Sequence, residues 1–414
     1  MVVAGGGLAG LRTVEELRAR GYKGTVTLCG AERHPPYDRP PLSKQLLTGE
    51  RDDTTLDADL AALGVDLRLG EAATGLAGGV LRTGGGEYPF DRLVVATGAA
   101  PIALPGDGTQ WFLRTIDDAL RLREAFRPGL RLAVIGAGWI GAELSTAAAA
   151  RGCDVTVVEA AAAPLAAAIG TEVGSVTASW YEAAGVELRL GQAVESVQPG
   201  GIALSGGGWL DADEIVTAVG VRPQVSWLEG SGVKLDNGVL VDEGLRTTVP
   251  GVYAAGDCAA FMSRLYGRRL RFEHWDVALH APEVAAANLL GGDEVYNPVP
   301  YFWSEQFGRM VQYAGYHGAA GRLVWRGDPA GRQWAVCWLA ASPDEPPPPD
   351  PPAGSPGGPA HPDPPAGAER LVAILAVGRP RDVLQGRRVI ASGAAVDAGK
   401  LADPDVPLRN ATTD

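Results

Sequence analysis

The sequence predicts an α/β protein in which two similar strand–helix–strand units follow one another. In the first unit, a short apolar strand runs into the glycine-rich turn Gly5–Gly10, a segment with helical periodicity follows, and a second strand covers Thr25–Cys29. In the second unit, the strand Leu132–Ile135 runs into a turn with the same glycine spacing, and the strand Asp154–Val158 comes after it. A repeat of this kind predicts two βαβ units.

A third observation supports the duplication. Each half contains a later strand-like segment that ends in a turn of small residues, Arg92–Pro101 in the first half and Glu214–Pro223 in the second. Two dinucleotide-binding βαβ units in one chain are the simplest explanation of all three observations.

Length and composition limit the alternatives. At roughly 100–200 residues per domain, the 414 residues suggest two to four domains, and 46% hydrophobic residues exclude a wholly disordered chain. The 57 glycines follow no Gly-X-Y period, which excludes collagen. A net charge of −13 argues against nucleic acid as the main partner. The chain has no uninterrupted run of about 18 apolar residues, so we expect no membrane span.

The cysteines and the first residues indicate the compartment. Cys29, Cys153, Cys258 and Cys337 form no CxxC or other close pair, which argues against a redox disulfide between near neighbours and against a compact zinc site. The opening sequence MVVAGGGLAG lacks the charged region and long apolar core of a signal peptide. We therefore expect a cytoplasmic protein without a bound metal.

The first glycine-rich turn has the spacing GxGxxG between a strand and a helix. Gly5 permits the tight turn, Gly7 lets the backbone approach a pyrophosphate, and Gly10 lets the helix pack closely. The helix N-terminus would then present N–H groups to the anion. The alternative is a purely structural turn.

Two features of this first unit are unusual. Only Met1–Ala4 precede the turn, so the first strand is either clipped or its start site is misassigned. Gly30 and Ala31 occupy the strand end where a ribose-binding acid is expected, which leaves Glu32 as the candidate.

The second turn repeats the pattern with Gly136, Gly138 and Gly141. Glu159 ends the next strand, where a carboxylate can bind both hydroxyls of an adenosine ribose and would repel a 2′-phosphate. The four residues that follow are alanines and offer no arginine, so we expect NADH rather than NADPH. Glu143 lies just inside the helix, where it either faces a ligand or simply interacts with the helix dipole.

The segment His34–Lys44 contains four prolines, which fix an extended path before a helix expected near Ser43. Its charged and aromatic side chains, Tyr37, Arg39 and Lys44, suit a flat ligand, although an ordinary surface loop is the alternative.

Further along, Val252–Phe261 reads as a strand followed by Gly-Asp and a helix, so Asp257 would cap that helix or accept a ligand hydroxyl. Trp275 and Trp303 could flank an aromatic cofactor, although from the residues alone packing in the core is the more common role.

Twelve of the 31 prolines fall between Pro343 and Pro365. This run has no apolar periodicity and is typical of an exposed spacer, with a recognition segment as the alternative. The flanking segments Gln333–Ala341 and Arg370–Gly378 are expected to be neighbouring strands of one sheet that the insertion connects.

Four segments together resemble the FAD-dependent, NADH-using ferredoxin reductases that supply oxygenases, and more distantly apoptosis-inducing factor. The resemblance runs from the first glycine turn to Leu401–Leu408. The segments that carry it are YDRPPLSK (Tyr37–Lys44), FLRTIDDALRLR (Phe112–Arg123), VYAAGDCA (Val252–Ala259) and YFWSEQ (Tyr301–Gln306).

The resemblance implies an α/β fold of two Rossmann-like nucleotide-binding domains, arranged as in glutathione reductase, plus a C-terminal α+β domain. The implied boundaries are residues 1–104 with 228–297 for FAD, 105–227 for NADH, and 298–414 for the acceptor interface. The last domain contains the proline-rich insertion, residues 342–368. A monomer or a homodimer is expected.

The same resemblance implies the site residues. Those expected to contact or lie near FAD are Ala9, Glu32, Arg39, Lys44, Ala73, Thr97, Gly98, Arg114, Asp257 and Trp275. The residues expected at NADH are Gly136, Gly138, Ile140, Gly141, Glu159 and Gly220. Lys44 would lie beside the flavin and pair with Glu143 near the nicotinamide, and Trp303 would lie at the flavin edge that faces the acceptor. Ala31 replaces the acid that many relatives carry at that position. Ala162 and Ala163 stand where relatives often carry arginine, and they are expected to loosen NADH binding.

The implied reaction is hydride transfer from NADH to the flavin, followed by two single-electron steps to an iron–sulfur ferredoxin that serves a cytochrome P450 or a Rieske dioxygenase. Because no thiol pair lies near Tyr37–Lys44, electrons should leave to a docked protein. The alternatives are a reductase of rubredoxin or oxygen, a redox-signalling protein resembling apoptosis-inducing factor, and an inactive flavoprotein.

An acidic ferredoxin would need a local basic surface on this acidic chain. Two groups of arginines could form it, and either could instead be a solvated face: Arg264, Arg268, Arg269 and Arg271, and Arg379, Arg381, Arg387 and Arg388.

Overall fold

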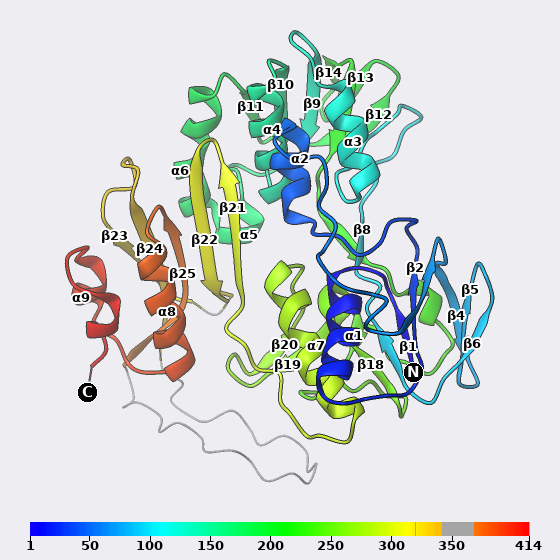
Figure 1. Ribbon diagram of the computed structural model, residues 1–414. Coiled ribbons are helices and arrows are strands. Elements are labelled where there is room, and N and C mark those ends of the chain that lie inside the picture. Colours follow the sequence, from blue (N-terminus) through cyan, green and yellow to red (C-terminus); the bar gives the residue numbers. More distant parts are fainter. Residues whose placement is uncertain (319, 342–367, 414) are drawn as a thin grey trace. The chain divides into compact units, whose positions relative to one another are not determined.

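The computed structural model describes residues 1–318, 320–341 and 368–413 (Figure 1). The chain divides into two compact units. The first comprises Met1–Ser263 and Arg268–Tyr296, and the second comprises Arg264–Gly267 and Asn297–Asp414.

The first unit contains a five-stranded parallel sheet in the order β18-β7-β1-β2-β3. Its strands are β1 (Val2–Ala4), β2 (Val26–Gly30), β3 (Val65–Leu69), β7 (Leu93–Val95) and β18 (Val252–Ala254). The short β1 is fully buried and pairs with β2 on one side and β7 on the other, which makes it a central strand of the sheet. The helix α1 (Leu8–Ala19) follows β1, so β1-α1-β2 is the predicted βαβ unit.

A second parallel sheet of the same unit has the order β11-β10-β9-β15. Its strands are β9 (Arg131–Ile135), β10 (Asp154–Glu159), β11 (Glu187–Leu190) and β15 (Glu214–Thr217). The helix α4 (Trp139–Ala150) connects β9 to β10, which confirms the predicted duplication. Parallel strands joined by a helix are the arrangement expected of a nucleotide-binding α/β fold.

The duplication extends beyond the βαβ units. A three-stranded antiparallel sheet, β4 (Ala73–Ala77), β5 (Val80–Thr83) and β6 (Glu87–Pro89), belongs to the first half. Its counterpart in the second half is β12 (Val194–Gln198), β13 (Gly201–Leu204) and β14 (Gly208–Asp211). The two halves meet where β8 (Ala99–Pro101) pairs antiparallel with β16 (Val221–Pro223).

The remaining elements of this unit are mostly helices. They are η1 (Pro40–Ser43), α2 (Gln45–Thr48), α3 (Ile116–Ala125), α5 (Ala166–Ile169), α6 (Thr171–Ala183), η2 (Ser226–Leu228), η3 (Gly256–Cys258), α7 (Trp275–Leu289) and the strands β17 (Val239–Leu240), β19 (Ala259–Ser263) and β20 (Arg268–Leu270). Helix α1 lies beside α7 (Figure 1) and buries Leu11, Val14 and Leu17, which recur at every third position along one face.

One predicted helix is wrong, and a second begins close to where it is expected. The segment after Gly256 forms a single turn, η3, and then the strand β19, which pairs with β17 and β20. Short apolar runs such as Ala259–Ser263 fit a helix or a strand equally well by pattern, and here strand pairing decides. Near Ser43 the structure has the 3₁₀ turn η1, and α2 begins only at Gln45.

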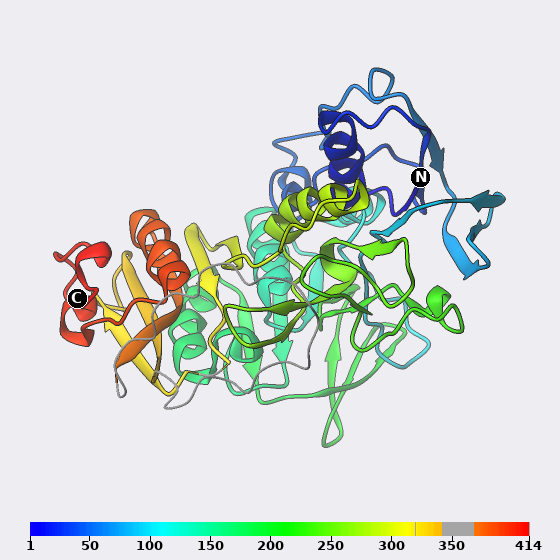
Figure 2. The same ribbon diagram turned by 90° about the horizontal axis from the view of Figure 1, so that it is seen from below.

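The second unit is an antiparallel sheet in the order β21-β22-β25-β24-β23, with helix α8 packed along one face (Figure 2). Its elements are β21 (Tyr301–Gln306), β22 (Arg309–Gly315), β23 (Arg322–Arg326), β24 (Trp334–Ala341), β25 (Glu369–Val377), α8 (Pro380–Ser392), α9 (Ala398–Ala402) and η4 (Leu408–Asn410). The predicted neighbours β24 and β25 are adjacent and antiparallel, which is confirmed. Residues 342–367 of the predicted insertion 342–368 lie outside the described residues.

The core of this second unit joins the sheet to the helices that follow it. Cys337 and Ile374 of the sheet pack with Val389 of α8 and Leu401 of α9, and all four side chains are buried. This is the predicted C-terminal α+β domain. Within the parts of the chain that the structure describes, no helix has the length and apolar composition needed to cross a membrane.

Candidate functional site

The glycines of the first turn divide into two kinds. Gly5 has φ +125°, and a Cβ there would lie 2.0 Å from the carbonyl oxygen of Ala96. A Cβ on Gly10 would lie 1.9 Å from the carbonyl oxygen of Gly5. At Gly7, by contrast, a Cβ would meet no described atom within 4 Å. The outer glycines therefore make the turn possible, and Gly7 leaves an open backbone surface that a phosphate group can approach.

The second turn has the same division. A Cβ on Gly136, where φ is +102°, would lie 2.6 Å from the carbonyl oxygen of Ala218, and one on Gly141 would lie 2.0 Å from that of Gly136. Around Gly138 the described atoms leave the Cβ position open to 4 Å. The chain thus has two turns of the same construction, each with one open glycine.

The helices that follow these turns begin without a side-chain cap, as α6, α7 and α8 also do. Gly7 and Gly138 are the N-cap residues of α1 and α4, and within the described chain no side chain caps either helix. Helix α3, by comparison, has a capping box formed by Thr115 and Asp118. Uncapped N–H groups at a helix N-terminus are a suitable site for a pyrophosphate.

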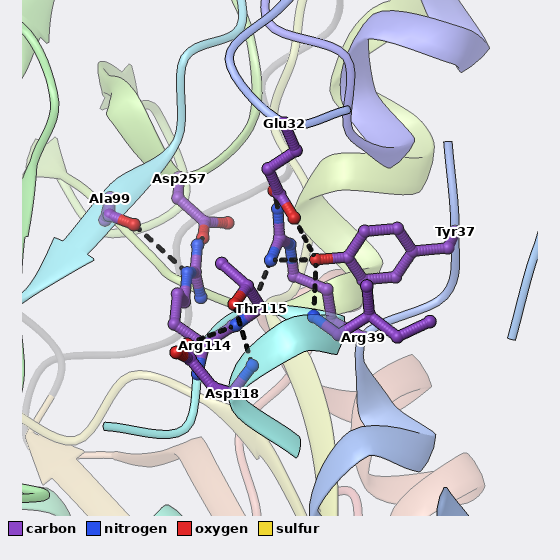
Figure 3. Close-up of polar contacts among 9 residues, drawn as sticks. Glu32, Tyr37, Arg39, Ala99, Arg114, Thr115, Asp118 and Asp257 are labelled. Carbon is purple, nitrogen blue, oxygen red and sulfur yellow. Dashed lines mark hydrogen bonds and ion pairs between the residues drawn. The ribbon is translucent and has the colours of Figure 1, made fainter. Parts of the chain in front are cut away.

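A polar network joins side chains from the segment after β2, the start of α3 and the turn η3 (Figure 3). Arg39 pairs with Glu32 at 2.7 Å between Nη2 and Oε1, and Tyr37 donates its hydroxyl to the other oxygen of Glu32 at 2.5 Å. Arg39 also donates to the backbone carbonyl of Arg114. Burial raises the pKa of Tyr37, so its hydroxyl stays protonated and remains a donor.

The network continues from Arg114 to Asp257, whose Nη2 and Oδ2 atoms are 2.7 Å apart. Arg114 also donates from Nε to the carbonyl of Ala99 at 3.0 Å. Four of the residues expected at FAD, Glu32, Arg39, Arg114 and Asp257, are thus joined by hydrogen bonds and ion pairs, although they come from three distant segments. The helix cap predicted for Asp257 is replaced by this ion pair, because the chain continues as β19.

Lys44 and Glu143 form an ion pair that joins the two halves of the duplication. Lys44 follows η1, Glu143 lies on α4, and 2.7 Å separates Nζ from Oε2. The side chains are 11% and 4% exposed, so the pair is largely shielded from water. Lys44 also donates to the carbonyl of Pro40 at 3.2 Å. The pairing expected from the sequence is present, and its place beside a flavin is a proposal.

Ser43 was not among the predicted site residues, although its hydroxyl donates to Oε2 of Glu143. Asp38 was also missed and accepts a hydrogen bond from Nε1 of Trp275 at 2.7 Å. Both residues belong to the segment His34–Lys44, in which the sequence already indicated side chains suited to a ligand. Their partners lie 100 and 237 positions away, so no local pattern could have shown the contacts.

Glu159 is held at the end of β10 by two backbone groups. Its carboxylate oxygens accept from the N–H of Ala137 at 2.7 Å and of Ala161 at 2.8 Å. Ala137 belongs to the second glycine turn, so the carboxylate lies next to the open glycine. Each oxygen retains a further lone pair with which to accept a ribose hydroxyl. Of the two alanines that stand where relatives often carry arginine, Ala162 is exposed and Ala163 is fully buried.

The other residues predicted in the first unit are located as follows. Ala9 lies in the first turn of α1 and is buried, and Ala73 begins β4. Thr97 donates to the carbonyl of Gln224 at 2.6 Å. Gly98 and Gly220 have φ of +69° and +106°. Ile140, in the first turn of α4, is 43% exposed, an unusual exposure for a large apolar side chain. Trp303 belongs to β21 of the second unit, where its ring stacks on Tyr301 with centroids 6.2 Å apart.

The cysteines offer no redox thiols. All four are free and buried. Burial raises the pKa of Cys29 and of Cys337 to about 12 and that of Cys258 to about 11. The thiolate is the reactive form, so these side chains stay protonated and inert near neutral pH.

Some arginines of the two predicted basic groups form hydrogen bonds and ion pairs with other residues of the chain. Arg269 donates to the carbonyls of Val241 and Ala260, and Arg271 pairs with Glu273 at 2.6 Å. In the second group, Arg379 pairs with Asp382, and Arg387 donates to the carbonyl of Val299. The outward face of α8 keeps two exposed arginines and, between them, an exposed leucine: Arg381, Arg388 and Leu384.

These observations fit two dinucleotides. Each glycine turn has an open backbone surface and an uncapped helix N-terminus for a pyrophosphate, and an acidic residue lies at the end of the next strand or just after it in each half. Lys44 and Glu143 lie where the two halves meet.

Comparison with known proteins agrees with this geometry. The chain matches the family model described as pyridine nucleotide-disulphide oxidoreductase over residues 1–281, and the model described as reductase C-terminal over residues 301–343 and 366–412. The anthranilate 1,2-dioxygenase system ferredoxin–NAD(+) reductase component of Burkholderia cepacia is 36% identical over 424 residues, with 99% of this chain and 98% of that protein covered.

Solved structures are similar over the same length. The crystal structure of Fdr9 has 46% sequence identity and a TM-score of 0.89, with 98% of each chain covered. The covalent putidaredoxin reductase–putidaredoxin complex has 28% identity and a TM-score of 0.88, with 99% of this chain and 97% of that chain covered. The chain therefore belongs to the pyridine nucleotide-disulphide oxidoreductase family, flavoprotein oxidoreductases that use FAD and NAD(H).

Proposed function

We propose that this chain is the NADH-dependent reductase of an iron–sulfur ferredoxin, which in turn supplies a dioxygenase or a cytochrome P450. The observation that carries the proposal is the shielded Lys44–Glu143 pair, which lies where the two dinucleotide-binding halves meet. Relatives that are named as ferredoxin reductases of oxygenase systems support the choice of acceptor, because they match this chain over nearly its whole length.

FAD, when bound, accepts two electrons from a nicotinamide and gives them up one at a time to a metal centre. The chain's own part is to bind and orient the two dinucleotides. The open glycines Gly7 and Gly138 and the helix N-termini of α1 and α4 would hold the pyrophosphates. Glu32 and Glu159 would accept from the ribose hydroxyls. Lys44 would place a positive charge beside the ring that gains electrons, in a position shielded from water.

Selection of NADH over NADPH would rest on Glu159. Both oxygens are fixed by backbone N–H groups, so the carboxylate cannot swing away from an added 2′-phosphate. The following residues, Ala160–Ala163, provide no positive charge to accept that phosphate. The negative charge of Glu159 therefore disfavours NADPH.

The four cysteines indicate how electrons leave this protein and in which cellular compartment it works. Many flavoproteins pass electrons to a neighbouring pair of cysteines, but the four cysteines here are buried, free and protonated. We propose that electrons leave directly to a docked ferredoxin and that the protein works in the cytoplasm, where cysteines remain reduced.

The test is a coupled assay with the purified, FAD-loaded chain, a [2Fe–2S] ferredoxin of an oxygenase system, and cytochrome c as the final acceptor. The proposal predicts that cytochrome c is reduced with NADH only when ferredoxin is present, and much more slowly with NADPH. Turnover that does not depend on ferredoxin, over a panel of such ferredoxins, would contradict it.

A further inference from the structure

Ser43 and Lys44 bind the same oxygen of the same buried carboxylate. Lys44 approaches Oε2 of Glu143 at 2.7 Å, and the hydroxyl of Ser43 donates to that oxygen as well. These two neighbours in sequence thus bind one acceptor on α4. Of the two, the family resemblance implies a role for Lys44 alone.

The proline segment explains how adjacent residues can share one acceptor. Pro40 and Pro41 fix the backbone at the start of η1, and Ser43 ends this turn. Ser43 is buried, and η1 packs against α4. The hydroxyl is therefore fixed by the same backbone that positions Lys44.

The hydroxyl of Ser43 has a second available acceptor, the carbonyl of Pro40, at 3.4 Å. A hydrogen bond to that carbonyl would be merely structural. The contact with Glu143 is closer, and a bond to an ionised carboxylate is roughly twice as strong as one between neutral groups. The hydroxyl of Ser43 therefore donates its hydrogen bond to Glu143 rather than to the carbonyl of Pro40.

We propose that Ser43 is a positioning residue for hydride transfer: its hydroxyl shares the charge of Glu143 with Lys44 and fixes the orientation of the carboxylate. This inference rests on the proposed function. A carboxylate that is 4% exposed needs hydrogen-bond donors to replace the water it has lost, and each donor restricts its rotation about the last bond. With both donors in place, the carboxylate and the ammonium have one arrangement where the two dinucleotides would meet.

The experiment compares Ser43→Ala and Ser43→Cys with the wild-type chain, all loaded with FAD. Cysteine keeps nearly the volume of serine but is a weak donor. Both variants should slow the reduction of FAD by NADH, measured by stopped-flow absorbance, by about 5- to 30-fold, the effect of losing one hydrogen bond to a charged group. The affinity for NAD⁺, measured by calorimetry, should change by less than about twofold. The lost hydrogen bond of Ser43 affects the orientation of the Glu143 carboxylate and not the groups that would bind the ribose or the phosphates.

A second readout does not depend on activity. Ser43→Ala should lower the melting temperature by about 2–4 °C in the wild-type background. In a Glu143→Gln background the same substitution should have less than half that effect, because a neutral amide oxygen accepts a weaker bond.

Ser145→Ala is the matched control, because Ser145 is also buried on α4 but donates to the backbone carbonyl of Gly141 at 2.7 Å. It should leave the rate of FAD reduction within about twofold of wild type. A Ser43→Cys variant as fast as wild type, or equal melting shifts in the two backgrounds, would overturn the proposal. Failure of NADH to reduce FAD in the wild-type chain would instead overturn the proposed function, and the role of Ser43 with it.

Discussion

Lys44 is the residue on which the proposed chemistry depends most. Its side chain is 11% exposed and its ammonium is bound to Glu143, so it is a fixed positive charge in surroundings that screen it weakly. Replacing it with alanine should slow FAD reduction by NADH about 10- to 100-fold, since preorganised charges of this kind stabilise a transition state. Stopped-flow measurement of the reduction rate checks this. Lys400→Ala, at an exposed position on α9, is the control, and an unchanged rate in Lys44→Ala would remove Lys44 from the mechanism.

His274 provides a prediction about pH. It precedes α7 at the N-cap position, and burial lowers its pKa from 6.5 to about 4. The unfolded chain therefore binds a proton between pH 6.5 and 4 that the folded chain does not, so folding stability is lost as the pH falls through this window. In His274→Asn, the melting temperature should fall less steeply than in wild type over the same range. Parallel curves for the two proteins would contradict the assignment.

The C-terminal domain has an arginine that links three of its elements. Arg326 ends β23, is 1% exposed, and pairs with Asp382 of α8 at 2.9 Å. It also donates to the carbonyls of Leu401 at 3.1 Å and Val406 at 2.7 Å, which ties the last segment of the chain to the sheet. The carbonyls of Asp403 and Pro404 also accept from Nη1 and Nη2, so each side-chain nitrogen of Arg326 donates inside the fold.

Replacing Arg326 with methionine should destabilise this domain by about 3–5 kcal/mol, because a buried partner and several carbonyls lose their donor. Urea unfolding followed by tryptophan fluorescence measures the loss, and limited proteolysis should show faster cleavage near Leu401–Val406. The exposed Arg322→Met on the same strand is the control and should have little effect. Equal midpoints for the two variants would contradict the structural role of Arg326.

The elements differ in how far the sequence predicts them. The glycine turns are local, since spacing, strand and helix all lie within about 25 residues, and both are found as expected. The pair β24 and β25 was also predictable, because each is a long apolar run bounded by turn residues. Strand β19 was not, because Ala259–Ser263 carries no period that separates strand from helix.

The site is less predictable than the fold because it is assembled from distant segments. Arg114 and Asp257 meet across 143 positions, and Ser43 and Glu143 across 100. Resemblance to a family supplied Arg114, Asp257 and the Lys44–Glu143 pair, but no pattern in this sequence indicated the contact of Ser43. Contacts of this kind depend on how the two halves pack, which one sequence does not specify.

The net charge of the chain leads to a prediction about salt. At −13 the chain repels an acidic ferredoxin on average, so docking requires local positive charge, such as the exposed Arg381 and Arg388. Raising the ionic strength from about 0.01 to 0.5 M should slow ferredoxin-coupled reduction of cytochrome c severalfold, since it shortens the range of the attraction. Reduction of FAD by NADH alone should change much less. A coupled rate that salt leaves unchanged would contradict electrostatic docking.

Electron transfer from NADH to the flavin and on to ferredoxin can be followed in a sequential-mixing stopped-flow experiment under anaerobic conditions. The FAD-loaded chain is mixed first with NADH, or with NADPH in a parallel run, and then with oxidised ferredoxin. We predict that NADH bleaches the flavin absorbance, that NADPH does so far more slowly, and that ferredoxin restores the absorbance as it becomes reduced. A flavin that NADH does not bleach, or a bleached flavin from which ferredoxin takes no electrons, would contradict it.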